Sequence, residues 1–145
     1  MNGRVANRVV AAVAAASLAA FPAFSAAQNP KAPRFLFSGE TFDFGTIPEG
    51  PVAEHIFMFK NVGKEPLIIQ SASASCGCVT PDWPKEPILP GKSGKIIVHY
   101  STQGRVGPFS KTVYIASNVA SERDRYELYI KGTVQSASAA SRPFG

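Results

Sequence analysis

The sequence has only two cysteines, two histidines and one tryptophan among its 145 residues. So few cysteines exclude a disulfide-rich scaffold, and two histidines leave few candidates for a general base. No serine–histidine–acid set, glycine-rich phosphate loop or paired-carboxylate motif can be recognised. The sequence therefore predicts a protein that is not an enzyme, with thiol chemistry at its two cysteines as the one activity left open.

Charge of either sign is also scarce. The 15 basic and 10 acidic residues are scattered, and their net charge of +5 includes two arginines close to the N-terminus. Neither a run of lysines nor a pattern of alternating basic and aromatic residues is present, which argues against nucleic-acid binding. The basic excess is too small to indicate attraction to a membrane surface.

A long apolar run occurs only near the N-terminus. Segment 1–27 combines Arg4 and Arg8 with an alanine-rich run from Val9 to Phe24 and then three small residues. This order is typical of a secretory signal peptide, with cleavage before Gln28. A membrane anchor is the alternative, but a span needs about twenty strongly apolar residues. We therefore expect a periplasmic or secreted protein that has no membrane span after cleavage.

Short runs of β-branched and aromatic residues make up most of the remaining chain. The expected strands are 34–37, 41–47, 52–61, 66–70, 95–100, 109–117 and 126–134. Glycine, proline and asparagine separate them, and none shows helical periodicity. This pattern predicts one Ig-like antiparallel β-sandwich of about seven strands over residues 34–134. Residues 28–33 are expected to be a linker, and residues 135–145 a disordered tail.

The two cysteines, Cys76 and Cys78, lie one residue apart in a segment expected to be a loop. In an extended strand, residues two apart have Cα atoms about 6.5 Å apart, and a disulfide needs Cβ atoms about 4 Å apart. The pair can therefore form a disulfide only if the chain turns at Gly77, and glycine permits backbone angles closed to other residues. Closing so small a loop would contribute little to the stability of the fold.

Three roles remain open for this pair. A disulfide here could be a labile redox bond. Two thiolates at Cys76 and Cys78 could instead bind Cu(I), whereas zinc would need two further ligands and only His55 and His99 offer imidazoles. Both cysteines could also simply pack at the end of a strand. Apart from Cu(I), no cofactor is expected.

Two features are candidates for a binding surface. Trp83 lies in a proline-rich loop, which would present its ring rigidly unless the ring folds onto the sandwich. Ile56 and Met58 share one face of their strand with Glu54 and Lys60, which makes that face less cleanly solvent-facing, and they mark an interaction surface unless a loop covers them.

Several segments together resemble a known family. The matching segments are 41–47 and 55–63, then 66–69 and Ser75–Pro81, and finally 90–91, 94–96, 98–100 and 107–109. Over Phe35–Val134, the chain resembles the bacterial "domain of unknown function 1573" family of exported Ig-like proteins, which are related to Hydin-type (ASH) domains. The resemblance implies the same fold and an envelope location, without an established activity. Because Hydin-type domains are regarded as interaction modules, it also implies that the partner is another envelope protein.

Overall fold

The computed structural model of the chain describes Ser17, Ala19 and residues 29–120 and 125–137. The expected signal peptide, apart from two of its residues, and most of the expected tail lie outside the described residues. The strands are β1 (Phe35–Phe37), β2 (Thr41–Pro48), β3 (Val52–Asn61), β4 (Ile69–Ala74), β5 (Val79–Asp82), β6 (Ser93–Ser101), β7 (Gly107–Ser117) and β8 (Tyr126–Gln135). Within the described ranges, no helix has the length and apolar character that crossing a membrane requires.

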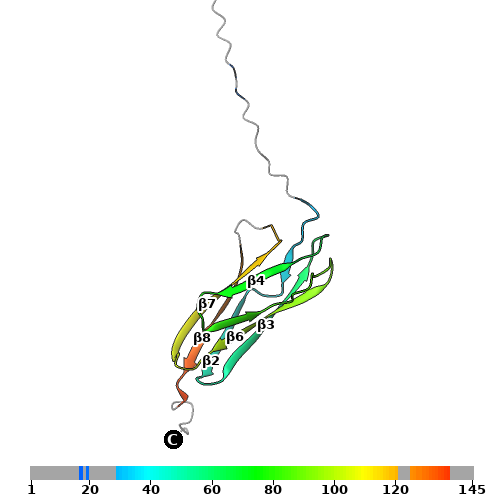
Figure 1. The fold of residues 1–145 in the computed structure, drawn as a ribbon. Coiled ribbons are helices and arrows are strands. Elements are labelled where there is room, and N and C mark those ends of the chain that lie inside the picture. The colour runs from blue at the N-terminus through cyan, green and yellow to red at the C-terminus, as the bar shows by residue number, and fades with distance from the viewer. Residues whose placement is uncertain (1–16, 18, 20–28, 121–124, 138–145) are drawn as a thin grey trace, which may run out of the picture.

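The strands form two four-stranded sheets packed face to face (Figure 1). Sheet I has the order β1-β3-β6-β5, and sheet II has the order β2-β8-β7-β4. All neighbouring strands are antiparallel except β2 and β8, which are parallel. The first described residues of the domain lie at one end of the elongated sandwich, and β8 finishes at the opposite end (Figure 1). The prediction of an all-β, Ig-like sandwich is confirmed.

The core lies between the sheets and follows the alternation of side chains along each strand. Four strands contribute consecutive inward pairs: Phe57 and Phe59, Ile96 and Val98, Val113 and Ile115, and Leu128 and Ile130. Each of these side chains is at most 2% exposed. Burying a side chain of this size contributes about 1.5–3 kcal/mol, so this layer is the main source of stability.

The structure differs from the sequence prediction in the centre of the chain. β4 begins at Ile69 instead of residue 66 and runs on through alternating serine and alanine, which carry little β-propensity. β5 lies within the expected loop, where it has only four residues and contains Pro81. A proline is tolerated there because β5 is an edge strand.

Residues 29–33, expected to be a linker, lie against the domain. Pro33 is buried, and the N–H of Lys64 donates a hydrogen bond of 3.1 Å to the carbonyl of Lys31. A Cβ added at Gly63 would lie 2.2 Å from the carbonyl oxygen of Ala32. Glycine is therefore required at this turn because two backbone segments approach each other closely.

Candidate functional site

Cys76 and Cys78 lie where the chain crosses from β4 in sheet II to β5 in sheet I. They form a disulfide, with their Cα atoms 5.3 Å apart. Cys78 belongs to the core and is 4% exposed, whereas Cys76 is half-buried. Cys76 is therefore the more exposed residue of the pair.

The chain turns at Gly77, as the disulfide requires. The N–H of Val79 donates a hydrogen bond of 3.4 Å to the carbonyl of Cys76, which closes the turn. However, Gly77 is not among the residues with positive φ, and a Cβ added to it would meet nothing within 4 Å. The turn therefore adopts backbone angles open to other residues, and the freedom that glycine offers at this position is not used.

The structure does not bring the two histidines to the cysteines. His55 stacks on Phe42 with ring centroids 3.6 Å apart, and burial lowers the pKa of its imidazole. His99 extends from the outer face of sheet I, where its Nδ1 lies 3.3 Å from a carboxylate oxygen of Glu54. Among the described residues, no three His, Cys, Asp or Glu side chains are grouped so that they could hold a metal ion. Copper binding at Cys76 and Cys78 would first require reduction of their disulfide, since the thiolate is the ligand.

Trp83 is half-buried and packs against the core from the loop after β5. The ammonium nitrogen of Lys85 lies 3.0 Å from the centre of its ring, a cation–π contact. Together with Pro84, Lys95 and Ile97, the ring lines a shallow groove of about 170 Å³. The tryptophan is therefore partly folded onto the sandwich and partly presented beside the outer face of sheet I.

The outer face of sheet I carries large apolar side chains. Leu36, Ile56 and Met58 are 57%, 40% and 46% exposed. Leu36 and Met58 line a groove of about 370 Å³ along β1 and β3, and Ile97 lies directly across from Ile56 on β6. We call these four residues and the two lysines that flank them, Lys60 and Lys95, the sheet I patch.

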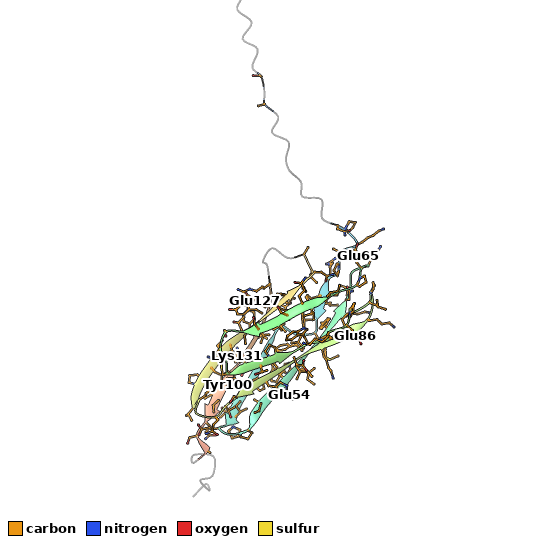
Figure 2. All side chains as sticks on the ribbon, in the orientation of Figure 1. Glu54, Glu65, Glu86, Tyr100, Glu127 and Lys131 are labelled. Atoms are coloured by element: carbon orange, nitrogen blue, oxygen red, sulfur yellow. A yellow bond between two sulfur atoms is a disulfide. The ribbon has the colours of Figure 1, made fainter. Side chains whose placement is uncertain are left out.

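The outer face of sheet II is different in kind. Tyr114 lies beneath the guanidinium of Arg125, and the hydroxyl of Tyr129 donates a hydrogen bond to Glu127. Figure 2 shows Glu127 and Glu54 on opposite sides of the sandwich. Because polar partners engage its aromatic side chains, this face resembles an ordinary solvated surface.

One important residue has no obvious signal in the sequence. Asn61, at the end of β3, is fully buried, and its side-chain amide donates hydrogen bonds to the carbonyls of Glu65 and Ile88. The oxygen of the same side-chain amide accepts hydrogen bonds from the backbone N–H groups of Arg34 and Gly63. The Asn-Val-Gly order of residues 61–63 indicates a turn, but the contacts to residues 34 and 88 depend on the tertiary fold.

The architecture is shared by solved proteins of the Ig-like, ASH and PapD-like class. An ASH/PapD-like domain of human CEP192 is 11% identical, with a TM-score of 0.60 over 94% of this chain and 99% of that domain. A protein of unknown function from Porphyromonas gingivalis is 16% identical, with a TM-score of 0.63. That match covers 76% of this chain, which spans about half (51%) of the longer protein. The CsuC–CsuE chaperone–adhesion subunit complex of Acinetobacter baumannii provides a match of 13% identity and TM-score 0.51, over 70% of this chain and 57% of the matched chain.

The family model described as "protein of unknown function (DUF1573)" matches residues 35–134. The chain belongs to this family, and the resemblance drawn from its sequence is confirmed. Among curated proteins, no sequence matches the chain. The structural relatives show the fold alone, because their sequence identities are low.

Proposed function

We propose that the chain is an exported, non-enzymatic interaction module of the bacterial cell envelope, and that it binds another envelope protein through the sheet I patch. The observation that carries this proposal is the exposure of Leu36, Ile56 and Met58 on two adjacent strands of one face. Contiguous apolar side chains on an otherwise polar surface mark sites of protein interaction. The N-terminal sequence pattern supports export.

The charges around the patch suggest the chemistry of the partner. Lys60 lies directly across from Leu36, and Lys95 lies directly across from Met58. At the other end of the face, Glu54 and His99 already pair with each other. An interface with an apolar centre and a basic rim favours a partner that offers apolar side chains flanked by carboxylates.

The relatives of this fold give general support. These relatives include an ASH/PapD-like domain and a complex of a chaperone with an adhesion subunit, and they share only the sandwich fold with this chain. We draw from them the class of function, which is protein interaction, and neither the partner nor the surface used.

Photo-crosslinking in the producing cells tests the proposal. A photoreactive amino acid is placed at Ile56 or at Met58, and the control carries it at Thr133, an exposed position of β8 in sheet II. We expect the two sheet I positions to form an adduct with the same envelope protein and the control to form none. A Met58→Glu variant should weaken binding of that protein at least tenfold, because a desolvated carboxylate replaces an apolar contact. Equal adducts from both faces would contradict the proposal.

A second candidate function is thiol exchange at Cys76 and Cys78. It is favoured by the presence of a disulfide whose Cys76 side is the more accessible. A thiolate of a dithiol reductant would attack the sulfur of Cys76, break the S–S bond and release Cys78 as a thiolate that takes up a proton. The second thiol of the reductant would then displace Cys76, which leaves two cysteine thiols and an oxidised reductant.

The intact mass of the protein from its native envelope distinguishes these two functions. Alkylation without reductant should add nothing if the disulfide persists, and mild reduction should add two alkyl groups if the bond is labile. Two thiols that can be alkylated in the native protein, together with stoichiometric copper that a Cys78→Ser variant loses, would favour a role in Cu(I) handling instead. A disulfide that resists mild reduction would exclude both thiol exchange and Cu(I) handling at Cys76 and Cys78.

A further inference from the structure

We propose that the open edge of β4 pairs with the same edge of a second copy of this chain. β4 is the outermost strand of sheet II, so no strand lies along one side of its backbone within the described part of the molecule. An open edge presents N–H and C=O groups that can template another strand. This surface is distinct from the sheet I patch, so the inference does not depend on the proposed function.

The other three edge strands carry features that oppose pairing. β1 has only three residues, and β5 has four that include Pro81. β2 carries Asp43, and its register with β8 shifts between Asp43 and Thr46. β4 has no charged residue and no proline, and its own register shift is confined to its first residues. Proteins normally protect a flat, uncharged edge, so its exposure at β4 suggests that another strand covers it.

The backbone of β4 has a defined outward set of hydrogen-bonding groups. The N–H of Ser75 donates a hydrogen bond of 2.9 Å to the carbonyl of Thr112 in β7. Because these groups alternate along an antiparallel strand, those of Ser73 also point toward β7. The N–H and C=O groups of Ala72 and Ala74 therefore point away from the sheet, toward the open edge.

The sequence of this edge identifies the occupant as a second copy. Residues 71–75 are Ser-Ala-Ser-Ala-Ser, which reads the same in both directions. In an antiparallel pair centred on Ser73, Ser71 of one copy faces Ser75 of the other, and Ala72 faces Ala74. The facing alanines are the residues whose backbone groups point outward, so each such pair can exchange two hydrogen bonds. The side chains and the backbone therefore favour the same two-fold register, as a self-complementary interface requires.

The sheet faces are also matched in this arrangement. Ser71, Ser73 and Ser75 are exposed, whereas Ala72 and Ala74 are half-buried on the inner side. Serine would therefore lie across from serine on the solvent side, and alanine across from alanine on the core side, with no like charges opposed. The two copies of sheet II would form one continuous sheet, and both sheet I patches would remain free. A contact limited to one short strand belongs to the weak class of interfaces, below about 1,200 Å².

Sedimentation equilibrium of the purified chain, from about 1 μM to about 1 mM, tests this pairing. We expect a reversible monomer–dimer equilibrium. Ser73→Lys and Ser73→Glu should each raise the dimer dissociation constant at least tenfold, because like charges would face each other at the two-fold axis. An equimolar mixture of the two variants should recover the dimer, since the lysine of one copy would then face the glutamate of the other.

Thr133→Lys and Thr133→Glu are the matched controls, at an exposed position of β8 on the same sheet. These variants should dimerise like the wild type, and thermal unfolding should show that all four variants fold. Ala74→Pro provides a second test, because it removes an outward N–H and leaves the bonds to β7 in place. The proposal is overturned if the wild-type chain stays monomeric throughout, if the Ser73 variants dimerise normally, or if their mixture does not recover the dimer.

Discussion

Asn61 and the Cys76–Cys78 disulfide both fix the chain where it leaves a strand, but they do so over very different spans of sequence. The disulfide joins residues only two positions apart. The side chain of Asn61 reaches 27 positions back to Arg34 and 27 positions forward to Ile88. The cysteines form the conspicuous motif of the sequence, whereas the asparagine is the residue that connects distant parts of the fold.

The difference shows that a covalent bond is not necessarily the stronger constraint. A cross-link stabilises mainly by restricting the unfolded chain, and a bridge across one residue restricts it little. A buried amide stabilises by satisfying backbone groups that would otherwise be desolvated without partners. We therefore expect the fold to depend more on Asn61 than on the disulfide.

The largest effect is expected from Asn61→Ala. The substitution leaves the carbonyl of Glu65 and the N–H groups of Arg34 and Gly63 without their hydrogen-bond partner. The carbonyl of Ile88 loses one of its two bonds and keeps the one from the N–H of Leu67. Each buried group left unsatisfied costs about 1–3 kcal/mol, and water will reach some of them. We expect the free energy of unfolding, measured in urea, to fall by about 3–4 kcal/mol in total.

Asn118→Ala is the matched control. Asn118 also bonds two backbone groups, the N–H of Ile68 and the carbonyl of Pro66, but it is exposed to solvent. Because water can replace these bonds, the loss should be only about 0.5–1 kcal/mol. Equal losses for the two asparagines would show that burial of Asn61 is not what makes it important.

A smaller effect is expected from reducing the disulfide. The loop-entropy relation for a closed loop of this size gives a stabilisation of about 1.5 kcal/mol. Urea unfolding of the same protein with and without reductant measures the difference directly, without a substitution in the core. A loss greater than that of Asn61→Ala would reverse the comparison between the two constraints.

The next effect concerns pH and His55. Burial lowers the pKa of its imidazole below the ordinary 6.5, so the folded protein binds a proton less readily than the unfolded chain does. The contribution of His55 to the free energy of unfolding is therefore fully present above about pH 6.5, and it should be lost as the pH drops below that value. His55→Phe keeps an aromatic ring against Phe42 and should flatten this dependence between pH 7.5 and 5.5. An unchanged pH dependence in the variant would assign the effect to other groups.

The sheets could be predicted from the sequence because most strands carry large apolar residues at every second position. The alternation along β8, from Tyr126 to Val134, is reproduced in its pattern of burial. β4 could not be placed correctly, because serine and alanine give no period-two contrast in hydrophobicity. The parallel pairing of β2 with β8 depends on how the chain crosses between sheets, which strand periodicity does not encode.

The candidate site was predicted only in part, for similar reasons. The geometry of a strand correctly required a turn between Cys76 and Cys78 if they are bonded. It could not show which sulfur is buried, because that depends on the packing of β5 against the core. The exposure of Ile56 and Met58 was left open in the sequence, since only the fold shows that no described loop covers them.

The smallest effect is expected from Gly77→Ala, which tests whether the turn between the cysteines needs glycine. Gly77 has no positive φ, and its missing Cβ faces open space. Alanine should therefore be accommodated without strain in the folded state. It also restricts the unfolded chain slightly, and we expect the free energy of unfolding to change by less than about 0.5 kcal/mol in total. Intact mass should still show the disulfide, and its rate of reduction should match that of the wild type. A loss of the disulfide in this variant would mean that the turn passes through a conformation that only glycine adopts. The disulfide would then depend on Gly77, just as the contacts between distant segments depend on Asn61.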